Sequence, residues 1–248
     1  PTMAILSPAA MFRLMAVKIS SEPLEVFTDF PRFSVTMIEV AETDSIMGKF
    51  VVTVVMSLVF TSGFCAPKTI LVLGDSISAA YGIDVGQGWV NLVQSRLQQE
   101  HPNYTMTNDS ISGDTTAGGL ARIDAALSAH KPAVLVLELG ANDGLRGLPP
   151  AQMKSNLATI ITKAQTAGAR VLLLSMRIPP NYGKRYTDQF YKTYTDLAQE
   201  MNIALVPFIL EDVALVKKLM QNDGLHPNAE AQPLIVDTIW PHLSPLLQ

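Results

Sequence analysis

Residues 70–78 read Ile70-Leu71-Val72-Leu73-Gly74-Asp75-Ser76-Ile77-Ser78. The first four are apolar, and a glycine follows them directly. A continuous apolar run that ends at a glycine is typical of a strand buried on both faces of a parallel sheet. Ser76 then lies just beyond the carboxyl end of that strand, where open α/β sheets bind ligands. A serine at that point is more often a helix N-cap than a nucleophile, so its role depends on the rest of the chain.

Downstream of this strand, apolar segments of strand length alternate with amphipathic segments of helix length. We expect strands at residues 68–74, 104–107, 133–139, 170–175 and 203–206, and helices at residues 87–100, 116–129, 150–167, 187–201, 211–218 and 228–243. This alternation predicts right-handed βαβ units and a parallel sheet that helices cover on both faces. The fold class is therefore α/β: one three-layer α/β/α domain at residues 67–248, with a five-stranded parallel sheet.

Composition excludes several classes of function. The 248 residues carry a net charge of −4, so the chain lacks the basic footprint of a nucleic-acid-binding protein. No glycine-rich dinucleotide or Walker-type loop occurs, which leaves nucleotide chemistry without support. The single cysteine, Cys65, excludes an internal disulfide, and the four histidines are scattered. We predict that the protein needs no metal and no cofactor.

The amino-terminal quarter differs from the rest of the chain. Met47-Gly48-Lys49 precedes an apolar run at residues 50–60 and then small residues. This pattern is typical of a secretory signal peptide, and the run is shorter than the roughly 18 to 20 residues of a membrane span. We predict a signal peptide at residues 47–66, with cleavage after Gly63, Cys65 or Ala66 left open, and a periplasmic or secreted protein without a stable membrane anchor. Residues 1–46 show no sustained period, and we interpret them as an upstream extension, disordered or non-native.

Polar loops follow three successive strands, at residues 74–76, 112–114 and 140–143. Because the carboxyl ends of parallel strands meet at one edge of a sheet, these loops should converge there. Near the carboxyl terminus, residues 222–227 read Asn-Asp-Gly-Leu-His-Pro, immediately before the last predicted helix. These four segments together are the candidate site.

Serine hydrolysis needs a nucleophile, a base and a carboxylate that fixes the tautomer of the base. Asp223 and His226, three residues apart in one turn, can supply the carboxylate and the base to Ser76, and the order Ser…Asp…His occurs in other serine hydrolases. The backbone N–H groups of Ser76 and Gly113 and the amide of Asn142 can donate to the oxyanion. Each residue alone has an ordinary reading as a turn or cap residue, but their joint occurrence favours acyl transfer.

The blocks Gly74-Asp75-Ser76, Gly113, Gly140-x-Asn142-Asp143 and Asp223-x-x-His226 resemble, in order and spacing, the GDSL or SGNH hydrolase family. The resemblance covers about residues 68–246, and within the family the bacterial thioesterases, lysophospholipases and arylesterases are the most similar. It implies a flavodoxin-like fold, Ser76 as nucleophile, His226 as base and Asp223 as its orienting carboxylate. Gly113 and Asn142 are the implied oxyanion donors. Ala141 departs from the glycine that is common in close relatives.

An acyl group requires an apolar cleft beside the nucleophile. We expect it to be lined by residues of the loops after the third and fourth strands, namely Leu145, Leu148, Pro149, Ile178, Pro179 and Tyr182. The resemblance implies substrates such as thioesters, lysophospholipids and aryl or short-chain esters, and a loop at residues 145–150 that shifts over the acyl chain. The expected partner is a small-molecule ester or thioester, and the expected oligomeric state is a monomer.

Three other functions remain as alternatives. A non-catalytic flavodoxin-like binding module would use residues 74–76 as an anion cradle, but it leaves the Asp223–His226 turn unexplained. An α/β-hydrolase with a nucleophile elbow needs Gly-x-Ser-x-Gly, and Ser78 stands where the last glycine belongs. A carbohydrate O-deacetylase of the same family is the nearest alternative, and the apolar loops argue against it.

Overall fold

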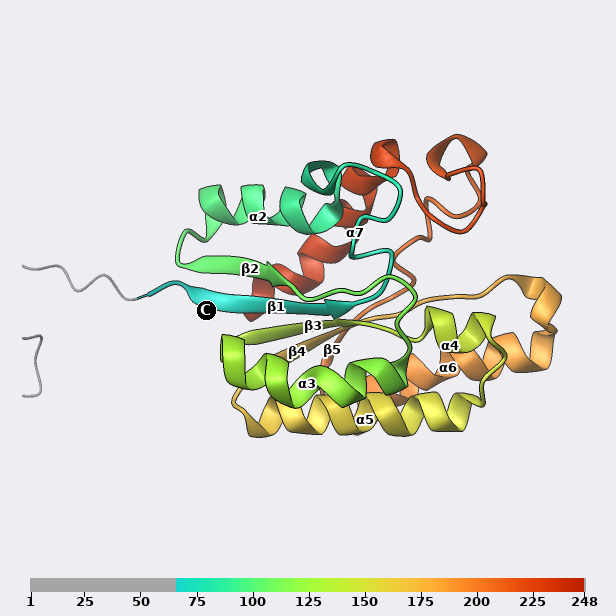
Figure 1. Cartoon of the computed structure of the whole chain (residues 1–248), viewed down its shortest axis with the longest axis horizontal. Helices are drawn as coiled ribbons and strands as arrows, with labels where there is room; N and C mark the ends of the chain where they lie inside the picture. The colour runs from blue at the N-terminus through green and yellow to red at the C-terminus, as the bar shows by residue number, and fades with distance from the viewer. Residues whose placement is uncertain (1–65, 248) are drawn as a thin grey trace, which may run out of the picture. The chain divides into compact units, whose positions relative to one another are not determined.

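The five strands of the computed structural model, which describes residues 66–247, form one parallel sheet (Figure 1). They are β1 (Lys68–Gly74), β2 (Tyr104–Asn108), β3 (Val134–Glu138), β4 (Arg170–Leu174) and β5 (Ala204–Val206). Their order in the sheet is β2-β1-β3-β4-β5, which is the flavodoxin-like order of a doubly wound sheet. The predicted fold class is thereby confirmed. Residues 1–46, and the predicted signal peptide up to Cys65, lie outside the described residues.

The centre of the sheet is apolar on both faces. In β1 the residues Ile70 to Leu73 are fully buried, and so are Val134 to Leu137 in β3. The two strands are neighbours, with Gly74 opposite Glu138 at their carboxyl ends. The uninterrupted apolar runs follow from this arrangement, because helices remove water from both faces.

Helices form a layer on each side of the sheet (Figure 1). On one side, α2 (Trp89–Glu100) packs against α7 (Gln232–Leu243). On the other side, α5 (Pro150–Thr166) packs between α3 (Thr116–His130) and α6 (Lys184–Glu200). None of the helices in the described part of the chain is long and apolar enough to cross a membrane.

Four expectations about the positions of helices and loops need correction. The segment predicted as a helix at 211–218 is a series of three-residue turns that ends in the 3-10 helix Lys217–Leu219. Most of its hydrogen bonds span three residues, and one, from the Ala214 N–H to the Leu210 carbonyl, spans four. Leu210, Val213 and Leu219, which are spaced at multiples of three, are buried. The loop predicted at 140–143 contains a short helix, α4 (Ala141–Leu145).

The terminal helix also begins later than predicted. The 3-10 helix Ala229–Ala231 precedes α7, which starts at Gln232 with a proline in its first turn. Helix α6 begins at Lys184, directly after Gly183, instead of at 187. These shifts leave the layers unchanged.

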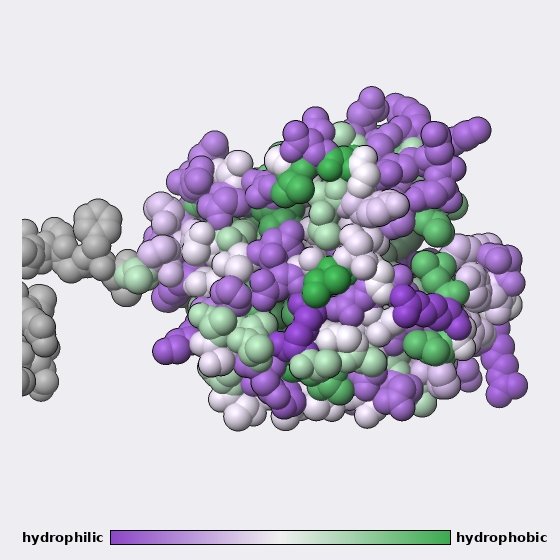
Figure 2. All heavy atoms as spheres, in the orientation of Figure 1, coloured by the Kyte–Doolittle hydropathy of each residue, from purple (hydrophilic) through white to green (hydrophobic). Residues whose placement is uncertain are grey.

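The carboxyl ends of the strands define one end of the molecule. The chain turns from β1 to β2 on one side of the sheet and reaches β3 on the other side of β1, so the β1–β3 boundary is the topological switch point where such sheets bind ligands. Figure 1 shows α4, the start of α6 and the loop before α7 at this end. Figure 2 shows several hydrophobic residues beside a hollow at the same end.

Candidate active site

Ser76 lies on a tight turn directly after β1, and its side chain is half-buried. The turn is held by Asp75, whose Oδ1 accepts the backbone N–H of Ile77 at 3.0 Å and whose carbonyl accepts that of Ala79 at 2.9 Å. Gly74 is required before it, because a Cβ there would lie 2.8 Å from Glu138 Oε2 and from Ser110 Oγ. Asp75 thus shapes the serine turn.

His226 and Asp223 come from one turn between the 3-10 helices Lys217–Leu219 and Ala229–Ala231. Asp223 Oδ1 accepts the backbone N–H groups of Leu225 at 2.9 Å and His226 at 3.0 Å. The other carboxylate oxygen lies 2.6 Å from His226 Nδ1. On the far side of the turn, Gln221 Nε2 donates to the carbonyls of Tyr81 and Pro227, which ties the turn to the segment after Ser76. The histidine is therefore fixed from both its backbone and its ring.

The ring of His226 joins this turn to Ser76. Its Nε2 lies 2.9 Å from Ser76 Oγ, across 150 residues of sequence. Desolvation raises the pKa of Asp223, but hydrogen bonds from the His226 ring and from the two backbone N–H groups outweigh it and lower that pKa to about 2. An ionised carboxylate only accepts hydrogen bonds, so Nδ1 carries the proton and Nε2 is free to accept the Ser76 proton.

Asn142 lies in α4, beyond the carboxyl end of β3. Its Nδ2 donates to Asp75 Oδ2 at 3.0 Å, so the residue before the serine also holds this amide. The next residue, Asp143, is buried and accepts the backbone N–H of Thr116 at 2.8 Å and its hydroxyl at 2.5 Å. Asp143 thus braces α4, which carries Asn142, against the start of α3.

Gly113 lies in the loop that leads into α3, with a φ of +80° that favours glycine. Its carbonyl accepts a hydrogen bond from Arg146 Nη2 at 2.8 Å, and Arg146 directly follows α4. The loops of Gly113 and Asn142 are therefore connected twice, through Arg146 and through Asp143. Sequence reasoning missed Arg146, since its exposed side chain carries no pattern that distinguishes it from a surface arginine.

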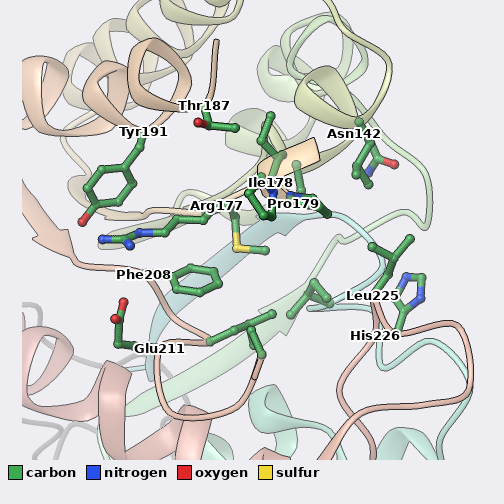
Figure 3. Close-up of a pocket in the computed structure, with 18 of the residues that line it drawn as sticks. Asn142, Arg177, Ile178, Pro179, Thr187, Tyr191, Phe208, Glu211, Leu225 and His226 are labelled. Atoms are coloured by element: carbon green, nitrogen blue, oxygen red, sulfur yellow. The ribbon is translucent and has the colours of Figure 1, made fainter. Parts of the chain in front are cut away.

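A cavity of about 950 Å³ opens beside these residues. Ser76, Asn142 and His226 line it, whereas Gly113 and Asp223 do not. In Figure 3, Asn142 and His226 lie at one end, and Arg177, Tyr191 and Glu211 lie at the other. The Arg177 guanidinium lies over the Tyr191 ring, 4.3 Å from its centroid.

Three of the six residues expected to line an acyl cleft lie at this cavity. Leu145, Ile178 and Pro179 line the cavity. Leu148, Pro149 and Tyr182 do not. Leu148 is exposed to solvent, and the Tyr182 hydroxyl donates to the Leu145 carbonyl at 2.8 Å. A further group of lining residues, which was not predicted, comes from the segments after β4 and β5, namely Met176, Phe208, Leu210 and Met220. The rule that residues after parallel strands meet at one edge applies equally to Phe208 and Leu210, and it would have found them.

Within residues 66–247, no group of three or more His, Cys, Asp or Glu side chains is placed to hold a metal ion. The two carboxylates at the site interact with neighbouring side chains instead: Asp223 contacts the His226 ring, and Asp75 accepts a hydrogen bond from Asn142. This arrangement can activate the Ser76 hydroxyl toward an electrophile bound in the cavity.

Comparison with known proteins gives consistent matches. Residues 72–233 match the model of the GDSL-like lipase/acylhydrolase family. Esterase TesA of Pseudomonas aeruginosa is 53% identical over 192 residues, which are 77% of this chain and 96% of that protein. The thioesterase 1/protease 1/lysophospholipase L1 of Escherichia coli K12 is 43% identical over 73% of this chain and 86% of its own. A crystal structure of the psychrotrophic esterase EstA from Pseudoalteromonas, inhibited by monoethylphosphonate, has a TM-score of 0.70 and 44% identity, and covers 73% of this chain and 98% of that one.

Proposed function

The chain belongs to the GDSL-like lipase/acylhydrolase family and is a serine ester hydrolase, and we propose that Ser76, His226 and Asp223 form its catalytic triad. One observation carries this proposal: the continuous chain of contacts from Ser76 Oγ to His226 Nε2 and from His226 Nδ1 to Asp223 Oδ2, at 2.9 and 2.6 Å. These are the distances at which a base removes the proton of a nucleophile and a carboxylate fixes the base.

The reaction proceeds in two steps through an acyl-enzyme. His226 Nε2 takes the Ser76 proton as Oγ attacks the acyl carbonyl, and the resulting imidazolium returns that proton to the departing alkoxide or thiolate. Water then attacks the acyl-serine, with His226 again as base, and the carboxylic acid leaves. Because the Asp223 pKa is about 2, its carboxylate stays ionised and stabilises the imidazolium in both steps.

The oxyanion of each tetrahedral intermediate accepts hydrogen bonds from Ser76 N–H, Gly113 N–H and Asn142 Nδ2. Asn142 supports this role best, since Asp75 takes only one of its two N–H bonds and the residue lines the cavity beside Ser76. The hydrogen bond from Arg146 to the Gly113 carbonyl anchors the loop that carries the Gly113 N–H. Such donors act mainly in the transition state.

We propose acyl esters and thioesters, lysophospholipids among them, as the substrate class. The cavity is within the roughly 300 to 1,000 Å³ range of small-molecule sites. The apolar side chains of Ile178 and Phe208 lie between the catalytic end and Arg177 (Figure 3), and Met176 also lines the cavity. An apolar channel of this kind suits a hydrocarbon chain better than the hydroxyl groups of a sugar, which argues against a carbohydrate O-deacetylase.

We also propose that the protein is exported and acts as a monomer in the periplasm or outside the cell. The support for export is the charged start, apolar run and small-residue end at residues 47–66. Immunoblots of periplasmic and cytoplasmic fractions from cells that express the full chain test it. Retention of the entire product in the cytoplasm would contradict export.

The substrate proposal is tested by kcat/KM for p-nitrophenyl esters of about two to sixteen carbons, with Ser76→Ala as control. Activity that extends to long acyl chains and vanishes in the control is expected. Activity confined to the acetate would indicate an O-deacetylase or a short-ester arylesterase. Activity that survives in Ser76→Ala would mean that another residue is the nucleophile.

A further inference from the structure

Glu138 is a fully buried carboxyl group at the end of β3, directly beside the site, and the mechanism above does not use it. Its Oε2 accepts the Ser78 hydroxyl at 2.7 Å and the backbone N–H of Asp75 at 3.2 Å. Within the described residues no N–H or O–H group donates to its other oxygen. A charged carboxylate without water around it normally has more donors than this, so the surroundings favour the neutral acid.

Asp75 is the second member of this buried pair. The carboxyl groups of Asp75 and Glu138 also lie within hydrogen-bonding reach of each other, and two carboxyls can share a hydrogen bond only when one holds a proton. Desolvation raises the pKa of Glu138 well above its ordinary value, and the negative charge of Asp75 raises it further. Desolvation raises the pKa of Asp75 only to about 6, because N–H groups of Ile77 and Asn142 donate to its carboxylate. At neutral pH the proton therefore resides on Glu138.

This distribution of charge determines how the Asn142 amide is oriented. The Asp75 carboxylate only accepts hydrogen bonds, so the amide must turn its Nδ2, not its oxygen, toward Asp75. The second N–H of the same nitrogen remains available to the cavity. If Asp75 held the proton instead, its O–H would attract the amide oxygen, and the donor would be lost from the oxyanion.

We propose that Glu138 is a positioning residue for ester hydrolysis: its neutral carboxyl donates to Asp75, and the Asp75 carboxylate in turn fixes the Asn142 amide as an oxyanion donor. The inference rests on the proposed function, in which Asn142 is such a donor. It adds to the triad a series of hydrogen-bonded residues: Glu138 at the end of β3, Asp75 in the serine turn and Asn142 in α4.

The other charged and titratable groups around the pair leave this assignment intact. His226 faces Asp75 from the turn before α7 and favours its charged form. Tyr194 of α6 faces both carboxyls but is itself buried, and its hydroxyl donates to the Leu139 carbonyl. Arg122 of α3 donates to the Gly74 carbonyl and is paired with Asp114.

The test compares Glu138→Gln and Glu138→Leu, each made in the wild type and in Asn142→Ala. Glutamine is neutral and keeps both an acceptor for Ser78 and a donor for Asp75, whereas leucine keeps neither. Leu135→Ala, also buried in β3 but distant from the loops, is the control for a general loss of stability. The readouts are kcat and KM for a p-nitrophenyl ester, with thermal unfolding of each variant.

Glu138→Gln is expected to keep kcat within about 3-fold, and Glu138→Leu to lower it about 10- to 100-fold with KM changed less than about 3-fold. In the Asn142→Ala background the leucine variant should cause less than about 2-fold further loss, because both changes remove the same donor. A purely structural role predicts the same loss in both backgrounds and an effect of Leu135→Ala like that of Glu138→Leu.

Three results would overturn the inference: unchanged kcat in Glu138→Leu, a glutamine variant as poor as the leucine variant, or equal losses with and without Asn142. If the leucine variant does not fold, Glu138→Ala replaces it, because water can enter the space that the smaller side chain leaves. The glutamine variant still tests whether a neutral group at this position is sufficient. Ser76→Ala separates the two levels of failure. If it is inactive while Glu138→Leu is unaffected, only this inference fails, and if it is active the proposed function fails.

Discussion

Replacing Asp223 by asparagine tests how the hydrogen-bond chain fixes the histidine. The side chain has no freedom to rotate, because backbone N–H groups of Leu225 and His226 donate to one of its oxygens at 2.9 and 3.0 Å. Asparagine must keep its oxygen there and place its NH₂ group where Oδ2 now lies, 2.6 Å from His226 Nδ1. Nδ1 then has to accept, so the ring proton moves to Nε2, and Nε2 can no longer accept the proton of Ser76.

The expected loss is large because the base is present but in the wrong tautomer. An equivalent change in a serine protease lowers kcat about 10⁴-fold, and we expect a decrease of that order, which corresponds to about 5 kcal/mol in the activation free energy. KM should change little, since Asp223 does not line the cavity. Stability should change little as well, because the side chain is 39% exposed.

The assay is hydrolysis of a p-nitrophenyl ester by the wild type and by Asp223→Asn near pH 8, with kcat and KM determined separately. Asp212→Asn is the matched control, because Asp212 carries the same charge, is exposed and does not itself line the cavity. It should keep full activity. A loss of less than about 10-fold in Asp223→Asn would refute the assigned tautomer, and with it the role of Asp223 as the orienting carboxylate.

Three further predictions concern the support of the site. Asn142→Ala should lower kcat about 100- to 1,000-fold with a smaller change in KM, and a pure KM effect in steady-state kinetics would make Asn142 a substrate-positioning residue instead. Asp143→Ala leaves the buried N–H and hydroxyl of Thr116 without an acceptor, so urea denaturation should show about 2 to 4 kcal/mol less stability, and an unchanged midpoint would contradict the brace. The folded-state pKa of Asp75 is raised from 3.8 to about 6, so its contribution to stability is present below about pH 4 and is lost as the pH rises to about 6. Asp75→Asn should therefore flatten the dependence of the unfolding free energy on pH in this range. An identical pH dependence in denaturation curves of the two proteins would argue against the shift.

The parts of the fold that were predictable are those that short sequence segments determine by themselves. The apolar runs before Gly74 and Glu138 have no alternative to burial, and they are the central strands β1 and β3. Asp223 and His226 are only three residues apart in one turn, so their contact could be predicted without knowledge of the tertiary structure. The contact of His226 with Ser76 joins residues 150 positions apart in the sequence. It could be predicted from the topology, because parallel strands bring the loops at their carboxyl ends to one edge of the sheet.

What was missed depends on tertiary packing. The segment at 211–218 has the composition of a helix, but burial of Leu210, Val213 and Leu219 imposes shorter turns on it. The far wall of the cavity includes Phe208, which is an ordinary apolar residue in the sequence. Glu138 follows an apolar run, and no sequence pattern indicates its role, because that role depends on the carboxyl group of Asp75, more than 60 residues away.

The most direct test of the central claim is to identify the residue that a phosphonate ester with a p-nitrophenol leaving group modifies. The account predicts release of one p-nitrophenol per active chain and, by peptide mass spectrometry, a phosphonyl group on Ser76 that Ser76→Ala does not acquire and His226→Ala acquires far more slowly. Modification of another serine, such as Ser78, or modification of Ser76 at the same rate without His226, would contradict it.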